Sequence, residues 1–145
     1  MEKATMGRVS VLAKIENVVE LFNAQKGLIA EDQVHRVDVP DALVDTGSTY
    51  LAMPKSMIER LGFDKPFTTQ EFRTTRGLGV SNIYGPVRLT IQGRFCNVDI
   101  AEVEEGCPVL IGQVPLELLD FVVDSKNQSL VGNPAHGGRY LLDLF

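Results

Sequence analysis

The segment Ala42-Leu43-Val44-Asp45-Thr46-Gly47-Ser48-Thr49-Tyr50-Leu51-Ala52-Met53-Pro54 is the most informative part of the chain. An apolar run ends at one carboxylate, Asp45, and three small polar residues follow before the chain becomes apolar again. Asp and Ser can hydrogen-bond their own backbone in such a turn, and Gly allows the backbone to approach closely. The pattern predicts a strand, a tight turn that carries a carboxylate, and a second strand. On these residues alone, Asp45 is either an ordinary turn residue or a catalytic group.

The composition describes an ordinary globular domain. The chain has 145 residues, 44% of them hydrophobic, which favours a single domain with a sizeable core. A formal net charge of −5 argues against a nucleic-acid-binding face. No run approaches the length of a membrane span, and the N-terminus lacks the apolar core of a signal peptide. Two cysteines do not make a disulfide framework, so we expect a cytoplasmic protein.

Period-two alternation of apolar residues predicts a mostly β chain. Strands are expected at 9–16, 18–22, 34–39, 70–75, 83–91, 95–103 and 108–112, with a hairpin of 121–124 and 129–131. Pro40-Asp41 is expected to break the strand before it, and residues 23–27 to form a loop. Short helices are expected at 54–62 and 114–119, each with an early Pro. The fold class is therefore all-β with two short helices, and the spacing suggests a closed or folded-over barrel.

Two further elements lie at informative distances beyond Asp45. A glycine-bearing bend, Arg76-Gly77-Leu78-Gly79, lies about thirty residues on (77 − 45 = 32). An apolar strand that ends in glycine, Leu110-Ile111-Gly112, lies further on (110 − 45 = 65), and a helix follows it. Asp-Thr-Gly alone is a weak signal, and its context raises the odds of a catalytic role. Gly-Leu-Gly is no phosphate-binding loop, because no Lys-Ser/Thr follows it.

On these residues the chain resembles the single-domain, retroviral-type (retropepsin-like) aspartic proteases in their cellular, prokaryotic form. The matching segments are Val44 to Ser48, Thr74 to Gly79, Tyr84 to Val87, Leu110 to Gly112, Leu116 to Leu119 and Val122 to Asp124, with Asn127. The resemblance covers residues 8–134, preceded by a lead at 1–7 and followed by a tail at 135–145. It implies a closed acid-protease barrel with a flap hairpin, a two-fold homodimer, and hydrolysis of a polypeptide substrate without metal or cofactor.

The family mechanism needs two carboxylates that share one proton, because like charges about 3 Å apart cannot both ionise. This chain carries one such motif, so a second copy must supply the second Asp45. The resemblance makes Thr46 a brace across the dimer, and Gly47 the position that permits close approach of the loops. Ser48 departs from the retroviral pattern, which usually has Ala there. A hydroxyl that donates to an ionised carboxylate favours the charged form, so we expect a more acidic activity optimum than with Ala.

The remaining site residues follow from the same resemblance. Its flap, which closes over substrate, comprises Thr75, Arg76, Gly77, Leu78, Gly79 and Val80. Leu110, Ile111 and Gly112 form the element that packs beneath the acid-bearing loop. An ordinary hairpin bend is compatible with the flap interpretation, and Leu110 and Ile111 belong to the core whatever the function.

Several alternatives stay open. Cys96, Cys107, His35 and His136 lack ligand-like spacing, so no metal site is expected. No Gly-x-Ser-x-Gly elbow supports a serine hydrolase. The tail at 139–145 is either a disordered end or a segment that joins the dimer interface or a neighbour's cleft. The alternative to an enzyme is a non-catalytic peptide-binding or dimerisation module on the same fold.

Overall fold

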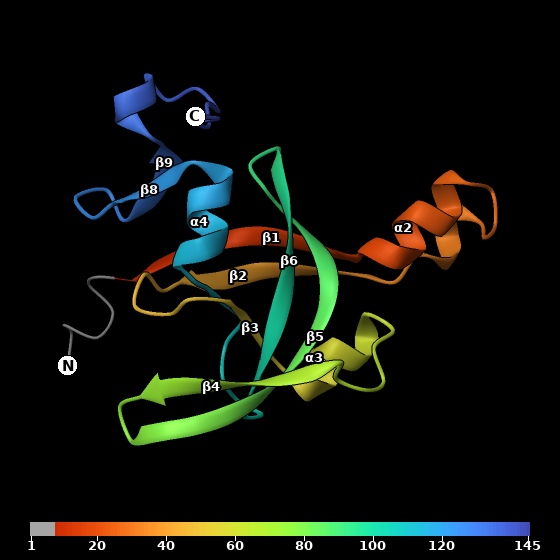
Figure 1. Ribbon diagram of the computed structural model, residues 1–145. Helices are drawn as coiled ribbons and strands as arrows, with labels where there is room; N and C mark the ends of the chain where they lie inside the picture. The colour runs from red at the N-terminus through yellow and green to blue at the C-terminus, as the bar shows by residue number, and fades with distance from the viewer. Residues whose placement is uncertain (1–7) are drawn as a thin grey trace.

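The computed structural model describes residues 8–145, and the expected lead at 1–7 lies outside the described residues. Its strands are β1 (Val9–Asn17), β2 (Arg36–Val44), β3 (Leu51–Pro54), β4 (Thr68–Thr74), β5 (Gly77–Ile91), β6 (Arg94–Val103), β7 (Leu110–Ile111), β8 (Phe121–Asp124) and β9 (Ser129–Gly132). The helices are α2 (Val18–Gln25), α3 (Lys55–Arg60) and α4 (Gln113–Leu119), with 3₁₀ turns η1 (Glu31–Gln33) and η2 (Pro134–His136). The mostly β chain expected from the sequence is confirmed (Figure 1).

Seven strands form one strongly curved sheet in the order β1-β2-β7-β3-β6-β5-β4. β1 pairs with β5 as well as with β2, so the sheet folds back on itself. Most neighbours are antiparallel, but β2 pairs with β7 and β3 pairs with β6 in parallel. The parallel pairs bring together segments about 50 to 65 residues apart, which is how β7 comes to lie beside the strand that leads to Asp45. β8 and β9 form a separate hairpin, and β9 lies against β1.

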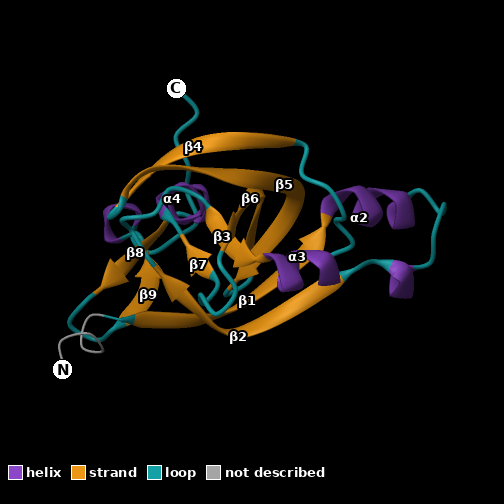
Figure 2. Cartoon of the chain, turned by 90° about the horizontal axis from the view of Figure 1, so that it is seen from below, coloured by secondary structure: helices purple, strands orange, loops and turns teal. Residues whose placement is uncertain are grey.

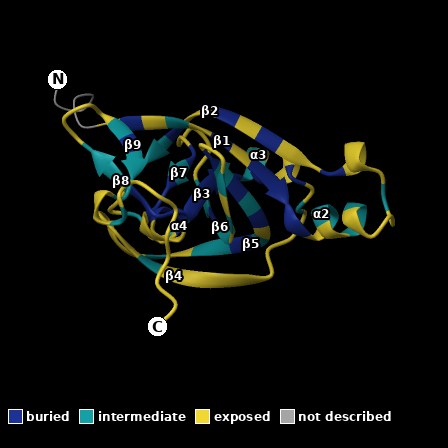
Figure 3. Cartoon of the chain, turned by 90° about the horizontal axis from the view of Figure 1, so that it is seen from above, coloured by how far each residue is buried: buried dark blue, intermediate teal, exposed yellow. Residues whose placement is uncertain are grey.

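The core lies inside the curved sheet, and alternation along the strands places it there (Figure 3). In β5, Val87, Leu89 and Ile91 are buried while the residues between them are partly exposed. Both short helices add a buried edge, with Ile58 from α3 and Leu116 from α4. The strands on either side of the acid-bearing loop, β2 and β3, share this core with β7 and α4.

The expectation of a strand at 18–22 is wrong, because these residues begin helix α2. The Asn17 side chain accepts a hydrogen bond from the Glu20 backbone N–H at 3.1 Å and caps the helix. Asn17 also donates through Nδ2 to the Leu61 carbonyl at 2.9 Å. The helix continues to Gln25, so the loop expected from residue 23 begins later. The apolar residues among Val18 to Phe22 are compatible with a strand or a helix, and the Asn17 cap decides for the helix.

The expectation that Pro40-Asp41 breaks a strand is also wrong, since β2 runs from Arg36 to Val44. Val39 pairs with Ala13 and Ala42 pairs with Val11, so Pro40 and Asp41 lie opposite one residue of β1. That arrangement is a β-bulge, one of the few places where a sheet accepts proline. Pro40 is exposed, and the strand continues past it to deliver Asp45.

Candidate active site

Asp45 follows the last residue of β2 and opens a loop of residues 45–50, called here the acid loop, that connects to β3. The Asp45 backbone N–H donates to the Ile111 carbonyl at 2.9 Å, which continues the β2–β7 pairing by one bond. The Asp45 carboxylate accepts from the Gly47 N–H at 3.0 Å, and the Ser48 N–H donates to the Asp45 carbonyl at 3.0 Å. These bonds form the tight turn predicted from the sequence. Asp45 is partly buried, and Thr46 and Gly47 are exposed beside it.

β7 and the start of α4 hold the acid loop from below. The Gly112 N–H donates to the Tyr50 carbonyl at 3.0 Å, the Gln113 N–H to Ser48 at 2.7 Å, and the Val114 N–H to Thr49 at 3.1 Å. A Cβ at Gly112 would lie 2.5 Å from the Tyr50 oxygen and 2.6 Å from the Ser48 oxygen. Only glycine therefore fits at this position. Ile111 and Gly112 contact the acid loop through backbone hydrogen bonds, and Leu110 precedes them in β7.

The contacts of Gln113 and Val114 with the acid loop are not apparent from the sequence. They depend on where the backbone of α4 begins, and no side-chain pattern encodes that. The signal that could have found them is Gly112 itself, because a glycine between a buried strand and a helix marks close contact of backbones.

The residues predicted to form a flap lie at the turn of the β4–β5 hairpin and in the first residues of β5. Thr74 pairs with Gly77, so Thr75 and Arg76 alone form the turn. The Thr74 hydroxyl accepts from the Arg76 N–H at 3.1 Å and donates to the Gly77 carbonyl at 3.0 Å. Gly77 has φ +111°, a conformation that favours glycine. Leu78 and Gly79 lie in strand β5 and not in the bend, which corrects the expected extent of the turn.

This hairpin stands out from the body, and its inner face is identified by one aromatic contact. The rings of Tyr50 and Phe72 lie edge to face, with centroids 5.5 Å apart. Phe72 pairs with Gly79, so these two residues share the face that looks toward the acid loop. Leu78 and Val80 lie on the opposite face and are 74% and 67% exposed. Neither Tyr50 nor Phe72 was among the residues predicted for the site.

A second loop beside the site is fixed by a charge-assisted pair of hydrogen bonds. The Glu105 carboxylate accepts from the Ser56 N–H at 2.9 Å and from the Ser56 hydroxyl at 2.7 Å. These bonds hold the pKa of Glu105 below its usual range. The bond ties the 104–106 loop to the first turn of α3, and no pattern in the sequence indicates it.

The cysteines and histidines lie in separate surroundings. His35 pairs with Glu20 at 2.9 Å, and His136 pairs with Asp120 at 2.7 Å. Burial raises the pKa of the Cys96 thiol to about 11, and Cys107 is exposed in a loop. Within residues 8–145, none of the helices is long and apolar enough to cross a bilayer.

The root of the tail is bound to the body, so the start of the 139–145 segment is not disordered in this structure. Asp120, which is 6% exposed, accepts from the His136 ring at 2.7 Å and from the Leu141 N–H at 3.2 Å. The Tyr140 hydroxyl donates to the Leu118 carbonyl at 2.9 Å. Arg94 donates to the Gly138 carbonyl at 2.7 Å, and its guanidinium lies 4.9 Å from the centre of the Tyr140 ring.

Three comparisons place the chain among known proteins. No protein-family profile matches it, and no curated protein matches it. Among solved structures, the solution structure of the simian foamy virus (mac) protease is 17% identical, with a TM-score of 0.44. The match covers 76% of this chain and 93% of the foamy virus protein.

Proposed function

We propose that this protein is an aspartic endopeptidase that acts as a two-fold homodimer. The observation that carries the proposal is the acid loop, in which one carboxylate follows a core strand and is supported from below by β7 and α4. The bond from the Gly47 N–H fixes the orientation of the Asp45 carboxylate at the start of the loop. In the proposal residues 8–134 form the protease domain.

In the proposed reaction two Asp45 carboxylates share one proton. The ionised carboxylate takes a proton from water, and the water oxygen attacks the carbonyl carbon of the peptide bond. The protonated carboxylate donates its proton to the carbonyl oxygen. Collapse of the tetrahedral intermediate breaks the C–N bond, and the nitrogen leaves with the proton that was taken from water. One hydroxyl of the intermediate returns a proton to the other carboxylate, which gives the carboxylic acid product and restores the starting pair. The protein supplies general acid and base, and water is the nucleophile.

The need for two copies follows from the surroundings of Asp45. Its carboxylate accepts from a backbone N–H of its own loop, and Thr46 and Gly47 beside it are exposed. A two-fold axis near the loop would bring the second carboxylate and the second Thr46 to the same place. The β4–β5 hairpin would then cover the substrate, with Gly79 and Phe72 facing it and Leu78 and Val80 available to the hairpin of the other subunit.

The free state of both cysteines supports a reducing compartment, and the proposal places the enzyme in the cytoplasm. The alternative is a module on the same fold that binds peptides or dimerises without cutting. The Tyr50–Phe72 contact favours that alternative if it holds the hairpin shut over the acid loop.

One experiment separates the two functions. The purified chain is sized by sedimentation and incubated with a peptide library from about pH 3 to pH 7. The enzyme is supported by a dimer that cleaves peptides and loses the activity on Asp45→Asn, with Asp64→Asn as a control at an exposed carboxylate. A folded chain that cleaves nothing across this range, and still binds peptides, would support the binding module.

A further inference from the structure

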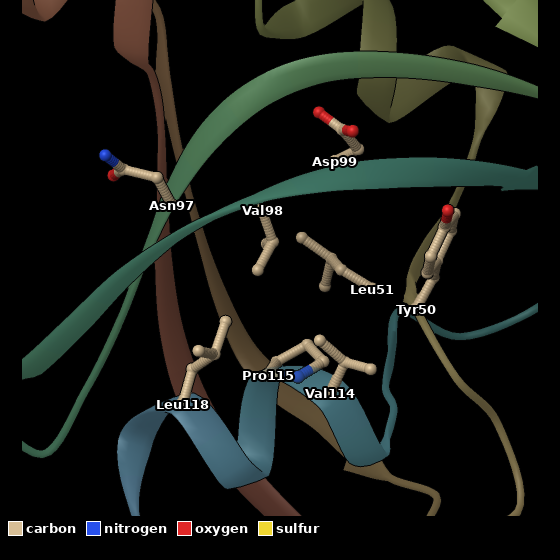
Figure 4. A pocket seen from close by; sticks show the side chains of 8 residues that line it. All are labelled: Tyr50, Leu51, Asn97, Val98, Asp99, Val114, Pro115 and Leu118. Atoms are coloured by element: carbon tan, nitrogen blue, oxygen red, sulfur yellow. The ribbon is translucent and has the colours of Figure 1, made fainter. Parts of the chain in front are cut away.

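An apolar groove lies between β6 and α4, next to Tyr50 of the acid loop. It has a volume of about 200 Å³ and is lined by Tyr50, Leu51, Asn97, Val98, Asp99, Val114, Pro115 and Leu118. Figure 4 shows Leu51, Val98, Pro115 and Leu118 converging on the gap, while the polar ends of Asn97 and Asp99 point away from α4. The volume lies below the ~300–1,000 Å³ of most small-molecule pockets, so it suits one large apolar side chain.

The groove lies between the acid loop and the root of the tail. At one end Tyr50 lines it, and the same ring contacts Phe72 of the β4–β5 hairpin. At the other end the Tyr140 hydroxyl donates to Leu118 of α4 and, at 3.3 Å, to Phe95 of β6. Tyr140 therefore bridges the two walls of the groove, and the chain that follows it starts from the groove's edge.

That following chain is an arm of unpartnered apolar residues. In the arm, residues 141–145, the exposed fractions are 44% for Leu141, 52% for Leu142, 87% for Leu144 and 113% for Phe145. Its root is held by Asp120, Arg94 and Tyr140, as described above. Beyond the root the arm leaves the body (Figure 2). None of its residues is among those that line the groove. An exposed apolar segment of this kind is typical of a surface that contacts another molecule.

We propose that the arm of one subunit lies in the β6–α4 groove of a second copy, and that the second copy returns the same contact. The arm offers apolar side chains and the groove offers an apolar slot of matching size, so the chain is complementary to itself. Such reciprocal contact is what a two-fold dimer requires. The inference rests on the proposed function only in needing two copies, and it adds a surface that the catalytic argument does not use.

The area of the contact decides how much it contributes. A buried aromatic side chain removes about 150–250 Å² from water. Two exchanged arms therefore bury on the order of several hundred Å², against about 1,200–2,000 Å² for a stable interface. The exchange strengthens an interface whose larger part lies elsewhere, so its loss should weaken the dimer without dissolving it at high concentration.

The test combines truncation with cross-linking in the full chain. Removal of residues 142–145, or Leu144→Ser with Phe145→Ser, should raise the dimer Kd at least tenfold in sedimentation, and Val114→Arg in the groove should do the same. Leu28→Ser, at a side chain that is 69% exposed on the far end of the molecule, is the matched control. A Kd that is unchanged by truncation would overturn the inference.

Cross-linking then identifies which subunit's groove holds the arm. In a Cys96→Ala, Cys107→Ser background, a Phe145→Cys chain is mixed with a tagged Leu118→Cys chain and oxidised. The expected product is the mixed dimer of tagged and untagged chains. A further chain carries both Phe145→Cys and Leu118→Cys. If a disulfide forms only within this chain and not between the mixed chains, the arm folds onto its own subunit, which contradicts exchange. Asp45→Asn should leave the cross-link intact, so a failed protease and a failed exchange give different results.

Discussion

Gly112 is the residue on which the geometry of the acid loop depends most directly. A Cβ there would lie 2.5 Å from the Tyr50 oxygen and 2.7 Å from the Thr49 carbonyl carbon, and both are backbone atoms that cannot swing aside. We predict that Gly112→Ala destabilises the protein by about 1–3 kcal/mol and displaces Asp45. The measurements are urea denaturation and kcat/KM on a peptide substrate. Gly79→Ala is the control for the stability measurement alone, because nothing lies within 4 Å of its Cβ position. Equal stability of the two variants would contradict the argument.

Ser48 is the position at which the acid loop departs from the retroviral pattern that the sequence resembles, which usually has Ala there. In residues 8–145 no hydrogen bond joins its hydroxyl to the Asp45 carboxylate, which accepts from Gly47 instead. We predict that the bond forms when two loops meet, and that it favours the ionised carboxylate. Ser48→Ala should then move the acid limb of kcat/KM to higher pH, because activity requires one ionised carboxylate. Ser48→Thr keeps a hydroxyl and should keep the limb in place. An unmoved limb in Ser48→Ala would remove the proposed role.

Asp120 links the charge state of one carboxylate to the order of the C-terminal segment. Its bond to the His136 ring, with further bonds from the Leu141 N–H and the Asn133 amide, holds the pKa of Asp120 below its ordinary value of 3.8. A lowered pKa contributes stability that is present above the ordinary value and lost as pH falls through the folded value. Asp120→Asn should therefore be less stable at neutral pH and lose less stability on acidification. Urea denaturation at several pH values measures this, and Asp64→Asn, at an exposed side chain, should follow the parent protein.

At the scale of elements, helix α2 shows how a polar contact can override an apolar pattern. Asn17 is 5% exposed, caps the helix through Oδ1 and reaches the Leu61 carbonyl through Nδ2. We predict that Asn17→Ala costs about 1–3 kcal/mol, from the lost cap and the lost buried hydrogen bond. Asn23→Ala, in the same helix, should change stability by less than about 0.5 kcal/mol. Far-UV circular dichroism with urea denaturation tests both. A cost confined to Asn23→Ala would contradict the role given to Asn17.

Local chemistry explains which elements could be predicted. The strands at 83–91 and 95–103, the helix after Pro54 and the 121–131 hairpin follow from alternation and turn residues, and the structure confirms them. The strand expected at 18–22 is wrong because the four apolar residues in this segment fit a strand or a helix. The Asn17 side chain decides between the two by capping the helix, and it is held by the Leu61 carbonyl, 44 positions away. The break at Pro40 was misassigned because a bulge depends on the register with β1.

In the candidate site, too, contacts between residues close in sequence could be predicted, and contacts between distant residues could not. Asp45 and its turn are local, and so they were predicted, as was the glycine strand beneath them. The ring contact between Tyr50 and Phe72 and the fixation of Glu105 by Ser56 join residues 22 and 49 positions apart, and no pattern in the chain encodes them.

At the scale of the whole molecule, different elements lie at the two ends of the curved sheet. Helix α2 projects from one end, where β1 ends and β2 begins, and the turn of the β4–β5 hairpin lies at the other end (Figure 1). The acid loop follows the opposite end of β2 from α2. In the proposed dimer the second subunit would therefore approach away from α2, and changes in that helix should leave the proposed activity unaffected.

The strongest prediction at this scale concerns mixed dimers. If each subunit supplies one Asp45, a dimer with one Asp45→Asn subunit has a single carboxylate and cannot share a proton as the mechanism requires. Equal amounts of parent and Asp45→Asn chains, exchanged at high concentration, should leave about a quarter of the dimers with two carboxylates. Activity per total chain should fall to about a quarter, and not to the half that simple dilution gives. Arg60→Ala, an exposed change on the α3 surface, serves as the inert mixing partner. A fall to one half with Asp45→Asn would mean that each subunit works alone.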